Sequence, residues 1–135
     1  MANALYDKGR EKFLTGAVSY SSDNIKIVLV DAADYTVNLS THEFLSDITA
    51  GGRVATSGNL ASKTTTAGVA DAADVTFTAV TGDQSEAVVM YKDTGSAATS
   101  PLIAYIDTAT GLPVTPNGAD ITVTWDNGSN KIFKL

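Results

Sequence analysis

The sequence LIAYIDTATGLPVTPNGADITVTWDNGSNKIFKL, residues 102–135, carries the clearest signal of the fold class. Gly111, Asn117-Gly118 and Asp126-Asn127-Gly128 interrupt short segments rich in β-branched and aromatic residues, which is the pattern of strands joined by turns. An Asn-Gly pair supplies the positive φ angles that a tight hairpin turn requires. The spacing therefore predicts a meander of short strands at 102–106, 112–114, 121–125 and 132–135.

Residues 24–31 (NIKIVLVD) are the strongest single strand outside that stretch. Ile25, Ile27 and Leu29 share one face, and the other face is also apolar toward the end of the segment, so we expect a central strand that is buried on both sides. Further strands are expected at 35–39, 53–55, 60–66, 69–70, 75–79 and 87–91. Their even spacing predicts a mainly β fold, an antiparallel β-sandwich or a partly open barrel.

A helix is expected at the N-terminus, from residue 3 to residue 15. Asn3 is a suitable N-cap, and Gly16 is placed to end the helix. Its basic side chains would lie mostly on the outer face. The inner face would carry Leu5, Gly9 and Phe13.

One short internal helix is expected at 41–48, capped by Ser40 or Thr41. Its inward side chains would be Phe44, Leu45 and Ile48. With 135 residues the chain predicts a single domain over 1–135, made of an N-terminal helix or arm (1–16) and a β domain (24–135).

The charge distribution argues against nucleic acid as a direct partner. The net charge is −6, and residues 67–120 contain seven acidic residues but a single basic residue, Lys92. Phosphate binding, in contrast, requires a basic surface. The chain has no cysteine, no apolar stretch of membrane-spanning length and no signal-peptide pattern in its first residues. We therefore expect no membrane association and synthesis in the cytoplasm.

Four aspartates form the arrangement that most resembles a cation site or an acid/base pair. Asp31-Ala-Ala-Asp34 is repeated forty positions later as Asp71-Ala-Ala-Asp74. Calcium needs six to eight oxygen ligands, more than such a motif supplies. Aspartates in this pattern commonly close local turns through their own carboxylates. The favoured interpretation is two copies of one turn, with no metal, although an ion at either motif stays open.

Other candidate catalytic or binding residues have simpler structural explanations. His42 is the single histidine, and no Gly-x-Ser-x-Gly elbow accompanies it, so we expect an exposed or capping residue. Trp125, Tyr91 and Tyr105 could stack on sugars or bases, but aromatic residues in such strands are more often core. The sequence predicts no enzyme activity, no catalytic residue and no cofactor.

Several segments together carry a resemblance to a known family. They are 1–11 (MANALYDKGRE), 26–31 (KIVLVD), 70–77 (ADAADVTF), 102–113 (LIAYIDTATGLP) and 125–128 (WDNG). Across nearly its whole length the chain resembles a family of small proteins encoded among the structural genes of tailed bacteriophages. The resemblance implies a virion component, most often a capsid decoration (cement) protein and less often a tail or head-to-tail connector part.

Such a protein is expected on the capsid surface of the virion, bound to the major capsid protein as a homo-oligomer, with a trimer favoured. The resemblance supplies no catalytic or binding residue. The candidate contact surface is instead chosen from the charged residues, as a basic set on the N-terminal arm and an acidic set in the middle of the chain. It consists of Lys8, Arg10, Lys12, Asp83, Glu86 and Asp93. A tail or connector component is the alternative, and a carbohydrate-binding β-sandwich module is the third.

Overall fold

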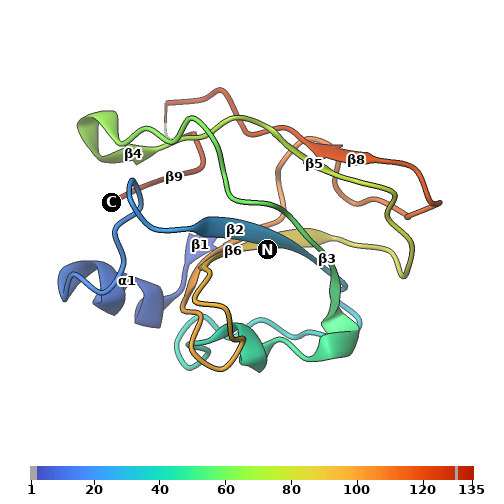
Figure 1. Ribbon diagram of the computed structural model, residues 1–135, viewed down its shortest axis with the longest axis horizontal. Coiled ribbons are helices and arrows are strands. Elements are labelled where there is room, and N and C mark those ends of the chain that lie inside the picture. Colours follow the sequence, from blue (N-terminus) through green and yellow to red (C-terminus); the bar gives the residue numbers. More distant parts are fainter. Residues whose placement is uncertain (1–2, 130) are drawn as a thin grey trace.

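The computed structural model, which describes residues 3–129 and 131–135, is built around one antiparallel sheet of five strands (Figure 1). Its strands, in spatial order, are β1 (Ala4–Leu5), β7 (Leu102–Ile106), β6 (Ala87–Lys92), β2 (Ile25–Val30) and β3 (Arg53–Thr56). Two small antiparallel sheets lie over one face of it (Figure 1): β4 (Val69–Ala70) with β9 (Phe133–Lys134), and β5 (Val75–Phe77) with β8 (Ile121–Val123). This arrangement confirms the expected mainly β class, as an open sandwich with a helix near the N-terminus, α1 (Asp7–Leu14).

Strand β2 is central, as its β-branched sequence predicted. It pairs with β6 along its whole length and with β3 on the other side. Five of its six residues are buried, and Ile27 and Val28 on opposite faces are both fully buried. Burying both faces of a strand requires a layer on each side of the sheet, and the chain supplies two.

The first core lies between the five-stranded sheet and the two small sheets. Ile27 and Met90 from the large sheet meet Phe77 and Val123 from the small ones, and Trp125 closes the same cluster. The pairing of β5 with β8 and of β4 with β9 thus forms the second layer of the sandwich.

The opposite face of the large sheet is covered by irregular chain, which contributes Tyr35, Leu45 and Ile48 to a second core. The expected strand at 35–39 and helix at 41–48 are wrong here. The structure has only a 3₁₀ turn at Leu45–Asp47, because the Asp47 carboxylate accepts the N–H groups of Glu43 and Phe44 and stops the backbone from winding further.

The predicted meander at the C-terminal end is also wrong, although three of its four segments are strands. β7 belongs to the large sheet, β8 pairs with β5, and β9 pairs with β4. Residues 112–114 form only an isolated bridge, between Val114 and Ser85. The Asn117-Gly118 turn exists, with the Asn117 side chain accepting the N–H of Ala119, but it does not join paired strands.

The N-terminal helix begins later than expected, after the edge strand β1. Asn3 is not its cap: the side chain accepts the N–H groups of Asp107 and Thr108. The fully buried Tyr6 fixes the start of α1 instead. The predicted end of the helix is correct, because Gly16 has a φ of 77°. The N–H of Gly16 donates to the carbonyl of Phe13 and the N–H of Ala17 to that of Lys12, and these are the two hydrogen bonds of a Schellman motif.

Deletion of residues 132–135 should abolish folding to a soluble monomer. It removes the buried Ile132 and the only strand that pairs with β4 among the described residues, and losing a buried Ile alone costs about 2 to 5 kcal/mol. The exposed edge of β4 would also favour aggregation. Size-exclusion chromatography and thermal melting test this, with Leu135→Ser as the control because Leu135 is 64% exposed. A truncated chain that stays monomeric with an unchanged melting temperature would contradict the prediction.

Candidate functional site

The three basic candidate contact residues lie on α1, and each is paired with an acid. Lys8 lies 3.3 Å from Glu11, and Arg10 lies 2.8 Å from Asp7, within the helix. Lys12 lies 3.0 Å from Glu43 and over the ring of Phe44. Exposed pairs of this kind contribute little stability, but they neutralise much of the charge. The basic set therefore has little net positive potential, and it does not form one surface, because Lys8 and Lys12 are one helical turn apart whereas Arg10 lies on another side of α1.

The three acidic candidates do not form one surface. Glu86 directly precedes β6 and accepts the N–H of Ala32 at 2.8 Å. Asp93 directly follows β6, so the two lie about 20 Å apart along the strand. Asp93 pairs with Lys26 at 2.8 Å, and this hydrogen bond holds the pKa of Asp93 below its usual value. Asp83 is close to Glu86 in the sequence, but its carboxylate lies near those of two other acidic residues, Asp31 and Asp34.

Asp83 joins Asp31 and Asp34 in a cluster whose carboxylate oxygens lie within 4.8 Å of one another. Asp31 is buried and closes its own turn by accepting the N–H of Ala33, as the sequence predicted. Three carboxylates at this spacing could contribute to holding a hard cation, but Ca²⁺ takes six to eight oxygens, and backbone or water would have to supply the others.

The second Asp-Ala-Ala-Asp motif adopts a different arrangement, so the interpretation of two identical turns is wrong. Asp74 accepts the N–H of Trp125 instead of closing its own turn. Asp71 forms a bridge with Thr64 through backbone groups in both directions. Long-range pairing therefore replaces the local turn in this copy.

His42 ends a chain of hydrogen bonds that runs into the second core. Its Nδ1 accepts the N–H of Asn38 at 3.3 Å and lies 2.8 Å from the hydroxyl of Tyr35. Since Nδ1 is an acceptor here, Tyr35 donates to it, and the Tyr6 hydroxyl, 2.8 Å from that of Tyr35, donates to Tyr35. His42 is half-buried and no helix begins beside it, so the expectation of an exposed or capping residue is wrong; its ring instead holds the backbone of Asn38.

The remaining aromatic candidates are core residues, as expected. Trp125 is buried, and its indole N–H donates to the carbonyl of Ala73. Tyr91 and Tyr105 are buried on the face of the large sheet opposite the first core. Stacking on a sugar or a base requires an accessible ring face, which these side chains do not offer.

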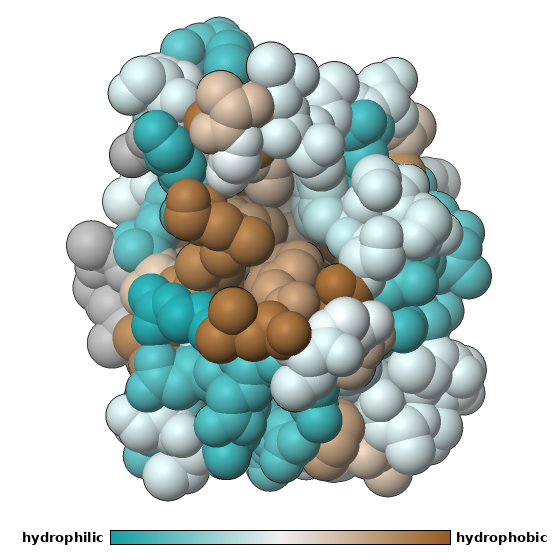
Figure 2. All heavy atoms as spheres, turned by 90° about the vertical axis from the view of Figure 1, so that its left-hand side faces the viewer, coloured by the Kyte–Doolittle hydropathy of each residue, from teal (hydrophilic) through white to brown (hydrophobic). Residues whose placement is uncertain are grey.

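The sequence reasoning missed an apolar surface at the end of the molecule that carries α1, β4 and β9. Figure 2 shows it as a brown patch among polar residues. Leu14 and Leu135 are 87% and 64% exposed, and they are the large apolar side chains that stand out in solvent within residues 3–129 and 131–135. Leu135 lines one hollow together with Phe13, Tyr20 and Phe133, and the ring of Phe133 packs against those of Phe13 and Tyr20 with centroids about 6 Å apart.

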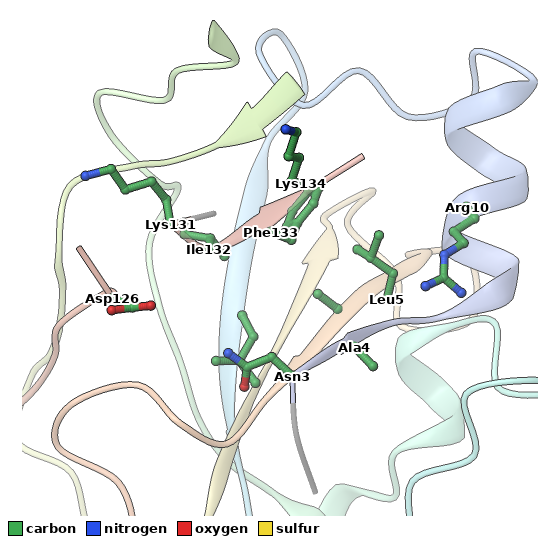
Figure 3. A pocket seen from close by; sticks show the side chains of 11 residues that line it. Asn3, Ala4, Leu5, Arg10, Asp126, Lys131, Ile132, Phe133 and Lys134 are labelled. Carbon is green, nitrogen blue, oxygen red and sulfur yellow. The ribbon is translucent and has the colours of Figure 1, made fainter. Parts of the chain in front are cut away.

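Two hollows flank Phe133 on this end. The larger, about 350 Å³, has the buried Leu5, Ala104 and Ile106 in its lining, and its rim includes Asn3, Arg10, Asp126, Lys131 and Lys134 (Figure 3). The smaller, about 80 Å³, is almost entirely apolar, lined by Phe13, Tyr20, Val69 and Leu135 among others. We call Leu14, Phe133, Leu135 and the two hollows the β9 end.

Comparison of the sequence with models of known protein families and with curated proteins finds no match in either case. Within the described residues, no helix has the length and apolar character needed to cross a membrane.

Proposed function

We propose that this chain is a non-enzymatic structural protein of a bacteriophage virion, a capsid decoration protein that binds the major capsid protein lattice and stabilises the head. The observation that carries the proposal is the β9 end, where large apolar side chains stand exposed beside concave hollows. Exposed apolar patches of this kind typically mark sites of interaction with other macromolecules. The resemblance of the sequence to structural proteins of tailed phages supplies the class of partner.

The mechanism is mechanical. Each copy would bury the β9 end against a capsid subunit, and the copies would act together because the lattice holds them at high effective concentration. A ligand that binds only the assembled state stabilises that state by mass action. Association of the copies with one another, as trimers for example, would increase this effect without strengthening any single contact.

Quantitative mass spectrometry of purified virions tests the proposal. We expect this chain at a copy number close to that of the major capsid protein. A tail or connector part would be present at a small fraction of that number, and absence from the virion would overturn the proposal altogether. Removing the chain from assembled heads should lower the temperature at which they release DNA.

A further inference from the structure

We propose that the β9 end docks an extended acidic segment of another protein, whose apolar side chains enter the two hollows on either side of Phe133. Only the identification of that protein as a capsid subunit rests on the proposed function; the chemistry of the segment rests on the surface itself. The hollows share Phe133 as a common wall, so one segment crossing β9 can contact both.

The apolar side chains that line the two hollows predict apolar side chains in the partner segment. Leu5 and Phe133 point toward one another at the larger hollow (Figure 3), whose lining includes the buried Ile106. The smaller hollow lies beside the ring pairs of Phe133 with Phe13 and Tyr20. Leucine-sized side chains entering these spaces would remove apolar surface from water on both partners, with a gain of about 25 cal/mol per Å².

The charges on the rim of the larger hollow predict acidic side chains in the partner segment. Lys131 and Lys134 border the larger hollow, and neither ammonium group forms an ion pair with a residue of the described chain. Arg10 is already paired with Asp7, and Asp126 is the one acid in the lining. In a chain whose net charge is −6, a rim with more cations than acids favours carboxylates in the partner and disfavours lysines.

The other possible occupants fit less well. A symmetric pair of copies would bring two such cationic rims into one interface, since a twofold interface uses one patch twice. A membrane surface is flat, whereas the apolar surface here is partly concave and presents two large exposed side chains. Concave apolar hollows suit individual side chains of a peptide segment.

The test uses the full chain and three fluorescently labelled synthetic peptides, followed by anisotropy. In the first peptide glutamate alternates with leucine, in the second lysine replaces glutamate, and in the third serine replaces leucine. We expect the first to bind, with affinity that falls as salt is added, and the other two to bind at least about tenfold more weakly. Equal binding of the lysine peptide, or no binding of the first, would overturn the inference.

Protein variants locate the site. Leu135→Ser and Lys134→Gln should each weaken binding of the first peptide by about tenfold and leave the melting temperature unchanged, because both side chains are exposed. Asn117→Asp is the charge-matched control: it also lowers the net charge by one, keeps the acceptor for the Ala119 N–H, and should leave binding unchanged. Equal losses in all three variants would overturn the inference.

Two further outcomes would replace the acidic segment by another occupant. Binding to anionic phospholipid vesicles that Leu135→Ser abolishes, with no peptide binding, would make the β9 end a membrane contact. A dimer in sedimentation that Leu135→Ser dissociates would make it a contact between copies. Because the peptide assay involves no virion, failure there together with a high virion copy number would overturn this inference and leave the proposed function standing.

Discussion

A spectrophotometric titration of the folded protein should show no tyrosinate absorbance until the whole chain unfolds. All five tyrosines are buried, with exposed fractions between 0% and 6%. Burial is the main reason that each pKa is raised, to about 12 for Tyr35 and upward also for the other four. Neighbouring carboxylates add to the effect, since Asp71 raises the pKa of Tyr20 and Asp93 that of Tyr91.

The direction of the stability change follows from these pKa values. In the unfolded chain tyrosine ionises near pH 10, whereas the folded chain holds the proton to higher pH. The stabilisation is therefore complete below about pH 10 and is lost as the pH rises toward the folded values. Each tyrosine that ionises only in the unfolded state lowers the free energy of unfolding by about 1.4 kcal/mol per pH unit, so Tyr6, Tyr20 and Tyr35, whose pKa values are raised most, lower it together by about 4.

With a typical domain stability of about 5 to 15 kcal/mol, this slope predicts cooperative unfolding within a few pH units above pH 10. Absorbance at the tyrosinate band and far-UV circular dichroism should change together in one transition. Tyrosinate absorbance that develops near pH 10 while the dichroism stays constant would mean that tyrosines are accessible in the folded protein, in contradiction to the burial found here.

Local sequence patterns predicted the elements whose conformation is decided locally. The β-branched run at Ile25–Val30 forms a strand as expected, because its side chains favour extended backbone and both faces are apolar. Gly16 ends α1 because a residue with positive φ was needed directly after the last turn. In both cases the controlling interactions lie within a few residues of one another.

Strand pairing could not be predicted in the same way, because it depends on partners far away in the chain. The turn residues after Ile106 and Trp125 predicted neighbouring hairpins, yet β8 pairs with β5 and β9 with β4, more than forty residues earlier. Turn signals show where strands end, but they do not fix which strand comes next in the sheet. The two hollows exist only through this pairing, since it brings β9 beside Leu5 and Tyr20.

The choice of candidate contact residues was limited in a similar way, because it considered charge but neither ion pairing nor position in the fold. Charge alone selected Lys8, Arg10 and Lys12. The partners of Lys8 and Arg10, Glu11 and Asp7, are one helical turn away and could have been predicted from the spacing, whereas Glu43, the partner of Lys12, is distant in the sequence. Lys131 and Lys134 were passed over because they stand among ordinary turn and strand residues. Their position on the rim of a hollow, without an acid partner in the described chain, is what distinguishes them.

Replacing Gly9 by Ala should destabilise the protein, although alanine is the better helix former. Gly9 lies where α1 packs on β7, and a Cβ there would come within 2.6 Å of the Leu102 carbonyl oxygen and 3.1 Å of the Ile103 Cα. These are backbone atoms of a buried strand, which cannot rotate away, so the helix itself would have to shift. Overpacking costs about 1 to 3 kcal/mol and often more against backbone, while the gain in helix propensity is at most about 1 kcal/mol.

The steric term should prevail, giving a net loss of about 2 kcal/mol and a melting temperature lower by roughly 6 to 10 °C. Gly58→Ala is the matched control, because Gly58 is exposed and a Cβ there meets nothing within 4 Å; it should leave stability unchanged or slightly raised.

Displacement of α1 would also move Arg10 and Phe13, which line the two hollows, so Gly9→Ala should weaken peptide binding even where the chain is still folded. If Gly9→Ala instead melts at or above the temperature of the unmodified protein, the close contact between α1 and β7 is not what holds the helix in place, and the geometry of the β9 end would have to be supported by β9 and β4 alone.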